Sequence, residues 1–199
     1  MNTLLAELRD FSFLETAAVV LAIAYLLLAI RQSIWCWICA GISTACYIWL
    51  FIGASLYMES ALNAFYFAMA AYGWYSWRRG GRDQESLPIV VWPMAMHIKA
   101  IALIVLLSLL SGYLLHAYSD AAYPYMDSLT TWSAIWATFL VARKVLENWW
   151  YWLLIDAVSM LIYWSRDLQL TALLFGMYLL LIPFGLWSWN RSFRSAVTA

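Results

Sequence analysis

Long apolar stretches that follow one another along almost the whole chain most constrain what it can fold into. A helix needs about 20 mostly apolar residues to cross a bilayer. Seven stretches qualify, at 13–30, 33–53, 58–77, 98–116, 128–142, 147–165 and 169–189. The fifth and sixth are the least distinct, because Arg143, Lys144 and Glu147 lie close together between them. The pattern predicts an all-α integral membrane protein with seven transmembrane helices.

The composition excludes a soluble domain and a nucleic-acid-binding protein. Of the 199 residues, 66% are hydrophobic and 11% are charged, whereas soluble domains contain about 25% charged residues. The 11 basic residues balance 11 acidic ones, so no basic surplus is present to neutralise phosphates. The N-terminal segment lacks the basic start and the small-residue cleavage site of a signal peptide. We therefore expect the first apolar helix to be retained.

Basic residues in the short loops predict the orientation, because cytoplasmic loops are enriched in Lys and Arg. One side of the predicted membrane has only Arg9 and Arg166. The other side has eight basic residues, namely Arg31, Arg78, Arg79, Arg82, Arg143, Lys144, Arg191 and Arg194. This asymmetry predicts an N-terminus outside the cell and a C-terminus in the cytoplasm.

The chain contains an internal repeat at an offset of 112 residues. Segments 31–79 and 143–191 share ten identities over 49 ungapped positions, and both close on a Gly-x-x-Ser-Trp motif. Two three-helix units separated by one helix must point the same way across the membrane, and such parallel repeats occur in transporters. We predict three regions: a first three-helix repeat at 1–79, a cytoplasmic connector with a linker helix at 80–118, and a second repeat at 119–199.

One carboxylate, Asp156, lies in the middle of a predicted helix at membrane depth. Placing it there costs on the order of 3 kcal/mol. Such a residue usually lines a functional cavity, and a structural bond to a neighbouring helix is the alternative. Aromatic rings beside a carboxylate suit a flat, cationic, hydrogen-bonding ligand. Helical spacing puts Asp156 on one face with Trp149, Trp152, Ser159 and Tyr163, with Asn148 at its edge.

The first repeat contributes further candidates for the same substrate site. Thr44 occupies the position that matches Asp156 in the second repeat. An amide at membrane depth, as at Asn63, is expected to bond a neighbouring helix or a substrate. The candidates from this half are Trp37, Ser43, Thr44, Asn63 and Tyr66.

Other classes of function lack the residues that they need. His97 and His116 lie at opposite ends of one predicted helix, so they cannot share a metal or haem, and Cys36 and Cys39 lack two further ligands. No phosphate-binding loop, nucleophile–base pair or buried lysine for a retinal Schiff base is recognisable. We therefore expect no enzymatic activity, no cofactor, no metal site and no nucleic-acid partner.

Two motifs closely resemble the Pnu family of vitamin transporters: the run Leu-Glu-Asn-Trp-Trp-Tyr-Trp at 146–152, with Ile-Asp-Ala-Val-Ser at 155–159, and Tyr-Gly-Trp-Tyr-Ser-Trp at 72–77. The resemblance covers essentially the whole chain. It implies a SWEET-like three-plus-one-plus-three fold, often a homotrimer, in the bacterial cytoplasmic (inner) membrane. It also implies facilitated diffusion of a vitamin that is trapped inside the cell by phosphorylation.

The resemblance leaves two substrates, thiamine for the PnuT type and nicotinamide riboside for the PnuC type. PnuC-like sequences often have Gln where this chain has Asn63, and Asn near Ser43 or Thr44. These departures favour thiamine. Trp149, Trp152 and Tyr66 would then stack on the rings, and Asn148, Asn63 and Asp156 would bond their polar edges.

We therefore expect a facilitative carrier for a cationic vitamin, with thiamine preferred and nicotinamide riboside as the alternative. No second titratable group is recognised at membrane depth to form a proton relay with Asp156, so we expect alternating access without ion coupling. The alternative of another class is a membrane scaffold or interaction protein whose aromatic residues only anchor it in lipid. Asp156 and the parallel repeat argue against that reading.

Overall fold

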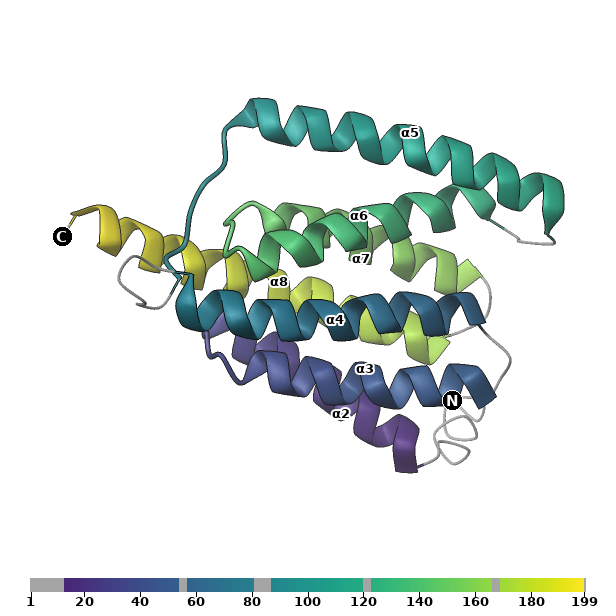
Figure 1. Cartoon of the computed structure of the whole chain (residues 1–199), viewed down its shortest axis with the longest axis horizontal. Coiled ribbons are helices and arrows are strands. Elements are labelled where there is room, and N and C mark those ends of the chain that lie inside the picture. Colours follow the sequence, from purple (N-terminus) through teal and green to yellow (C-terminus); the bar gives the residue numbers. More distant parts are fainter. Residues whose placement is uncertain (1–12, 54–56, 81–86, 120–122, 166–168, 199) are drawn as a thin grey trace. The chain divides into compact units, whose positions relative to one another are not determined.

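The computed structural model describes residues 13–53, 57–80, 87–119, 123–165 and 169–198, and within them the chain is helical apart from short connections (Figure 1). Every predicted apolar stretch coincides with a helix. α5 and α6 begin four residues earlier than predicted, because Pro93 precedes α5 and Pro124 is tolerated in the first turn of α6. The helices are α2 (Phe13–Ile30), α3 (Cys36–Gly53), α4 (Tyr57–Arg79), α5 (Met94–Tyr118), α6 (Pro124–Ala142), α7 (Asn148–Ser165) and α8 (Gln169–Thr198).

Four of the described helical segments are long and apolar enough to cross a membrane: Phe13–Ile30, Cys36–Gly53, Met94–Tyr118 and Thr171–Ala196. α4, α6 and α7 contain acidic residues and many Tyr and Trp residues, which lower their mean hydropathy. Large apolar side chains are nevertheless exposed along the helices, for example Leu106, Leu154 and Leu180. Such surfaces suit lipid rather than water. The helices are confirmed, and seven crossings of the membrane stay a prediction.

The chain forms two compact units. Unit 1 comprises residues up to 89 with 142–144 and 183–199, and unit 2 comprises 90–141 with 145–182. α8 therefore contributes to both units, and the linker helix α5 belongs with α6 and α7. The three-region division expected from the repeat stays a prediction.

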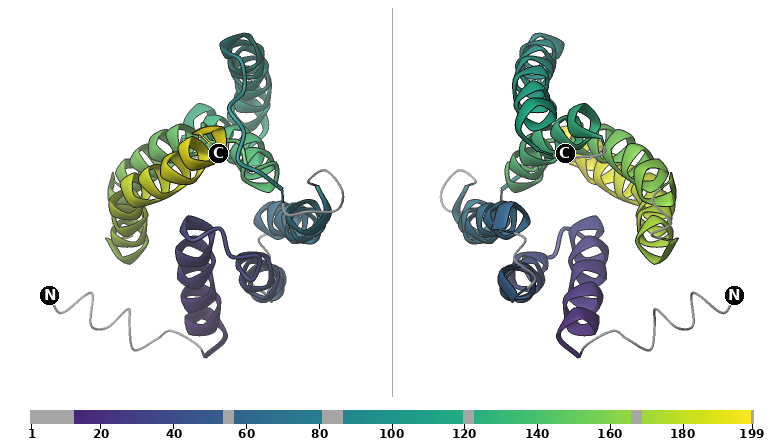
Figure 2. Two further views of the ribbon diagram at one scale, coloured as in Figure 1. Left: turned by 90° about the vertical axis from the view of Figure 1, so that its left-hand side faces the viewer. Right: turned by 90° about the vertical axis from the view of Figure 1, so that its right-hand side faces the viewer.

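In unit 1, α3 lies between α2 and α4 and packs against both (Figures 1 and 2). At one end of this unit three buried rings form a tryptophan cluster. Trp77 lies edge-on to Trp37 at 5.5 Å and to Trp189 at 6.0 Å between ring centroids. α3 and α4 can approach closely here because Gly73 has no side chain: a Cβ would lie 2.3 Å from the Trp37 ring.

In unit 2, α5 contacts α6 through a narrow stripe of its surface. Trp132 donates from its indole Nε1 to Ser111 Oγ at 3.1 Å, and a Cβ at Gly112 would lie 2.5 Å from the Tyr125 ring. Elsewhere in unit 2, α7 contacts α8: the Tyr163 ring stacks on Phe175 with 5.4 Å between ring centroids. The buried residues of α5 recur about once per turn, at His97, Ala100, Ile104, Ser108 and Gly112.

The turns after α2 and α6 have the same geometry at the repeat offset of 112 residues. Gln32 and Lys144 both adopt the left-handed conformation, with φ of 55° and 50°. Both turns are Schellman motifs, in which a backbone N–H just past the helix bonds a carbonyl of its last turn. The equivalent bonds run from Ser33 to Leu28 at 2.9 Å and from Val145 to Leu140 at 2.9 Å. The sequence repeat is therefore accompanied by a repeat in local structure.

Candidate functional site

The predicted site residues of the second repeat lie along one face of α7. Asn148, Trp149, Asp156 and Ser159 are buried, and Trp152 is half-buried. The opposite face, with Trp150, Leu154 and Leu161, is exposed. The helical period thus separates a lipid-type surface from a protected surface that holds two aromatic rings, an amide, a carboxylate and a hydroxyl.

Asp156 has no hydrogen bond and no ion pair among the described residues, although its side chain is only 4% exposed. The structure therefore offers no support for the alternative in which a neighbouring helix bonds this carboxylate. A buried carboxylate without a donor is unfavourable. A ligand that brings a positive charge or a hydrogen-bond donor would remove that cost.

Asn148 is the first residue of α7 and is fully buried. Its Nδ2 donates to the backbone carbonyl of Val145 at 2.7 Å. Its Oδ1 is buried and has no hydrogen-bond partner among the described residues. Because the nitrogen is held by the backbone, the amide presents its oxygen as a fixed acceptor. Leaving such an acceptor unpaired costs about 1–3 kcal/mol, so the position suits a ligand with an N–H or O–H group.

The candidates of the first repeat lie on α3 and α4 in unit 1. Gly41 lies opposite Ala70 and Ser60 donates to the Ile48 carbonyl, and this register brings Asn63 and Tyr66 to the level of Thr44. The Ser43 hydroxyl donates to the Ala18 carbonyl, and Thr44 and Asn63 donate to carbonyls of their own helices. Their donors are used by the backbone, so their oxygens remain as acceptors. Trp37 packs in the tryptophan cluster.

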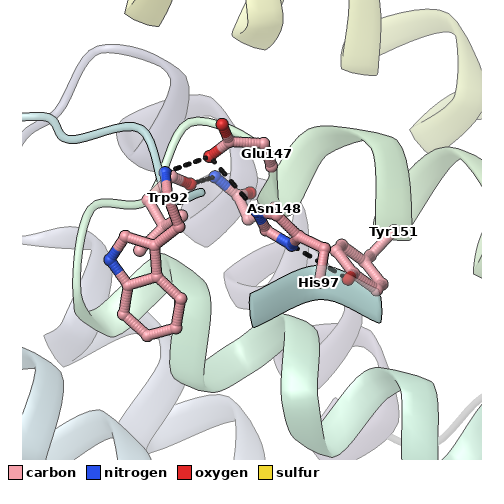
Figure 3. A network of polar contacts seen from close by, with 6 residues as sticks. Trp92, His97, Glu147, Asn148 and Tyr151 are labelled. Carbon is pink, nitrogen blue, oxygen red and sulfur yellow. Dashed lines mark hydrogen bonds and ion pairs between the residues drawn. The ribbon is translucent and has the colours of Figure 1, made fainter. Parts of the chain in front are cut away.

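A polar network that the sequence analysis missed joins α5 to the start of α7 (Figure 3). His97 Nδ1 lies 3.0 Å from the Tyr151 hydroxyl, and its Nε2 lies 3.9 Å from Glu147 Oε2. The backbone N–H of Trp92 donates to the same Glu147 oxygen at 3.4 Å. Glu147 lies in the turn just before α7 and Tyr151 lies in the first turn of α7, four residues later. Nothing local in the sequence points to His97 as their partner.

Lys144, which the sequence analysis counted only among the basic residues of the short loops, is buried. Its side chain is 6% exposed, and Nζ lies 4.6 Å from the centroid of the Trp77 ring. The left-handed turn allows this residue to reverse the chain and cover the tryptophan. Burial lowers the pKa of the Lys144 ammonium group from its ordinary value.

No group of three or more His, Cys, Asp and Glu side chains suited to a metal ion occurs among the described residues. His97 and His116 both belong to α5. At 1.5 Å per residue they are separated by about 28 Å along the axis. These two histidines therefore cannot bind the same metal ion or haem.

Comparisons with known proteins point to one family. Residues 12–191 match the family model described as nicotinamide mononucleotide transporter. The chain is 23% identical over 179 residues to the nicotinamide riboside transporter PnuC of Escherichia coli (strain K12), covering 77% of this chain and 75% of the relative. It is 26% identical over 175 residues to the riboflavin/roseoflavin transporter RibM of Streptomyces davaonensis, covering 85% and 81%.

The fold is shared with a solved structure. The crystal structure of the vitamin B3 transporter PnuC superimposes with a TM-score of 0.73 and covers 97% of this chain and 87% of that one. The two sequences are 19% identical. The helical architecture is therefore retained although most side chains differ.

Proposed function

Because the chain belongs to the nicotinamide mononucleotide transporter family, we propose that it is a facilitative carrier for a vitamin with a flat, nitrogen-containing ring. The family model spans nearly the entire chain, and the two relatives described above are named as transporters. The apolar helices suit a membrane setting, for which we propose the bacterial cytoplasmic membrane. The scaffold alternative gains no support from these relatives.

We propose nicotinamide riboside as the substrate, in place of the thiamine preference expected from the sequence. The matched relatives are named for nicotinamide riboside and riboflavin, and neither name supports thiamine. Nicotinamide riboside carries a cationic pyridinium ring, a carboxamide with N–H donors, and ribose hydroxyls. Riboflavin has no positively charged ring, so a buried carboxylate favours the riboside of the two.

The observation that carries this proposal is the face of α7 with Asn148 and Asp156. The unpartnered Oδ1 of Asn148 would accept a hydrogen bond from the carboxamide or a ribose hydroxyl. The Asp156 carboxylate would lie near the pyridinium charge, and Trp149 and Trp152 would stack on the ring. A desolvated cation–π contact is worth about 2 kcal/mol. Ser159 would add a hydroxyl to the same face.

Several finer points stay part of this proposal. The recurrence of the turn geometry at Gln32 and Lys144 supports the SWEET-like arrangement of two parallel repeats around α5. The contributions of Trp37, Ser43, Thr44, Asn63 and Tyr66, the homotrimer, the orientation of the termini, and trapping by phosphorylation are carried over from the sequence and the family resemblance.

Calorimetric titration of the detergent-purified protein with nicotinamide riboside, thiamine and riboflavin tests the substrate. We expect the riboside to bind at least about tenfold more tightly than the other two, a difference of about 1.4 kcal/mol. Tighter binding of thiamine would restore the original expectation. Binding of none of the three would favour the scaffold.

Proteoliposomes test the mode of transport. We expect labelled riboside to equilibrate across the membrane without accumulation, whether or not a proton or sodium gradient is imposed. Accumulation that depends on one of these gradients would show ion coupling and contradict facilitated diffusion.

A further inference from the structure

The connector that precedes α5 runs beside the loop that precedes α7, and both belong to unit 2. Val90 forms a parallel bridge with Val145, and the Leu146 N–H donates to the Val90 carbonyl at 2.8 Å. Two residues further along the connector, the Trp92 N–H donates to Glu147 Oε2 at 3.4 Å. The loop therefore donates one hydrogen bond to the connector and accepts another from it.

His97, in the first turn of α5, adds a third point of attachment (Figure 3). Glu147 and Tyr151 lie one turn apart and flank its ring, at 3.9 Å and 3.0 Å. When the tyrosine hydroxyl donates to Nδ1, the ring hydrogen resides on Nε2 and faces the carboxylate. With this tautomer Nδ1 accepts a hydrogen bond, whereas Nε2 makes an electrostatic contact with the carboxylate at 3.9 Å and no hydrogen bond. The His97 side chain is 7% exposed, so water competes little for either contact.

Two of the residues that make these contacts are next to Asn148 or hydrogen-bonded to it. The Asn148 Nδ2 donates to the carbonyl of Val145, the residue that forms the bridge with Val90. Glu147 is the residue immediately before Asn148. The direction in which the Asn148 Oδ1 points therefore depends on a loop whose position is held by the connector and by His97.

We propose that residues 90–97 form a clamp that orients the substrate-binding end of α7, with His97 and Glu147 as positioning residues for the Asn148 amide. The inference rests on the proposed function, because it assumes that Asn148 contacts the substrate. It assigns a task in recognition to the connector and the linker helix, which otherwise only join the two repeats. When the contacts of residues 90–97 are lost, the Asn148 side chain can rotate. Its Oδ1 then no longer points toward the substrate, and the hydrogen bond between them is weakened.

The test compares His97→Ala and His97→Gln with His116→Ala as matched control. His116 lies in the same helix beside a tyrosine ring, at 6.4 Å from Tyr125, and takes no part in the network. Affinity for nicotinamide riboside is measured by calorimetry. Hydrogen exchange of residues 143–151 is followed by mass spectrometry without ligand, and the melting temperature is recorded for each variant.

We expect His97→Ala to bind about tenfold more weakly, the effect of one hydrogen bond, and to exchange faster in 143–151. Glutamine can both donate and accept, so His97→Gln should restore most of the affinity. His116→Ala should match the unmodified protein in both measurements. A purely structural role predicts instead that affinity falls only in step with the melting temperature and that glutamine gives no rescue, which would overturn the clamp.

Asn148→Ala separates this inference from the proposed function. If Asn148→Ala weakens binding while His97→Ala binds normally, the substrate site stands and the clamp is wrong. If Asn148→Ala binds the riboside with normal affinity, the proposed site is wrong and the positioning role is overturned with it.

Discussion

Trp189 donates a hydrogen bond of 2.9 Å from its indole Nε1 to the backbone carbonyl of Ala29, a residue 160 positions earlier in the chain. Ala29 belongs to the last turn of α2, and its carbonyl also accepts the backbone N–H of Gln32 at 2.9 Å, so the indole takes the second acceptor position of this oxygen. The Ser188 hydroxyl donates to the next carbonyl, that of Ile30, at 2.9 Å. The second part of α8 thus caps the end of α2 within unit 1.

We predict that Trp189→Phe lowers the stability of the protein. Phenylalanine keeps an aromatic ring in the tryptophan cluster but removes one of the two hydrogen bonds that the buried Ala29 carbonyl accepts, and the bond from the Gln32 N–H remains. The expected cost is about 0.5–1.5 kcal/mol. The melting temperature in detergent measures the effect. Trp187→Phe is the matched control, because Trp187 is 64% exposed. Equal melting temperatures of the two variants would show that the hydrogen bond contributes nothing.

Gly73→Ala should destabilise the protein strongly, whereas Gly41→Ala should not. A Cβ at Gly73 would lie 2.3 Å from the Trp37 ring, and one at Gly41 would lie 3.9 Å from the Ala70 Cβ, an ordinary contact. Overpacking a buried contact costs about 1–3 kcal/mol, while alanine inside a helix is favoured over glycine. Thermal unfolding of both variants checks this. A Gly73→Ala protein as stable as Gly41→Ala would contradict the close packing of α3 on α4.

The buried Lys144 predicts a specific pH dependence. Because burial lowers the pKa of Lys144 in the folded state below 10.5, the unfolded chain binds more protons than the folded protein between the two values. Stability from this group therefore rises as the pH rises through that window and is lost below it. Lys144→Met removes this dependence. We expect its stability relative to the unmodified protein to fall as the pH increases.

Urea unfolding between pH 7 and 10 measures this difference. Lys99→Met, at an exposed position of α5, controls for the general loss of one lysine. A Lys144→Met difference that stays constant over the whole range would show that the ammonium group is not desolvated by its position over Trp77.

Asp156→Asn should weaken binding of nicotinamide riboside about tenfold or more, since the carboxylate charge that pairs with the pyridinium is lost. Stability should stay about equal, because the amide has the shape of the carboxyl group and that group has no hydrogen-bond partner among the described residues. Calorimetry and the melting temperature are measured on the same preparations. Glu59→Gln, at an exposed acidic residue of α4, is the control. Normal affinity together with a lower melting temperature would make Asp156 a structural residue.

The sequence alone predicted the helices, because a run of about 20 apolar residues can be recognised locally and a bilayer requires such a run to form a helix. It also placed Trp149, Trp152 and Asp156 on one face with Asn148 at its edge, since the helical period depends only on spacing. The repeat at 112 residues was not used to predict any turn, yet Gln32 and Lys144, one repeat apart, adopt the same left-handed conformation in the structure. The Asp156 carboxylate and its aromatic neighbours suit any cationic ring, and the expectation of thiamine rested only on Asn63 and on Ser43 or Thr44. The named relatives fit nicotinamide riboside better.

Tertiary structure decided which side chains meet. His97 contacts Tyr151 across 54 residues and Trp189 contacts Ala29 across 160, and no pattern within a helix encodes either pair. The burial of Lys144 and the direction of the Asn148 amide also depend on neighbours brought together by folding. Helices in this chain arise from local hydrophobicity and backbone hydrogen bonds, whereas polar contacts between them require a particular helix packing and register, which only the folded chain specifies.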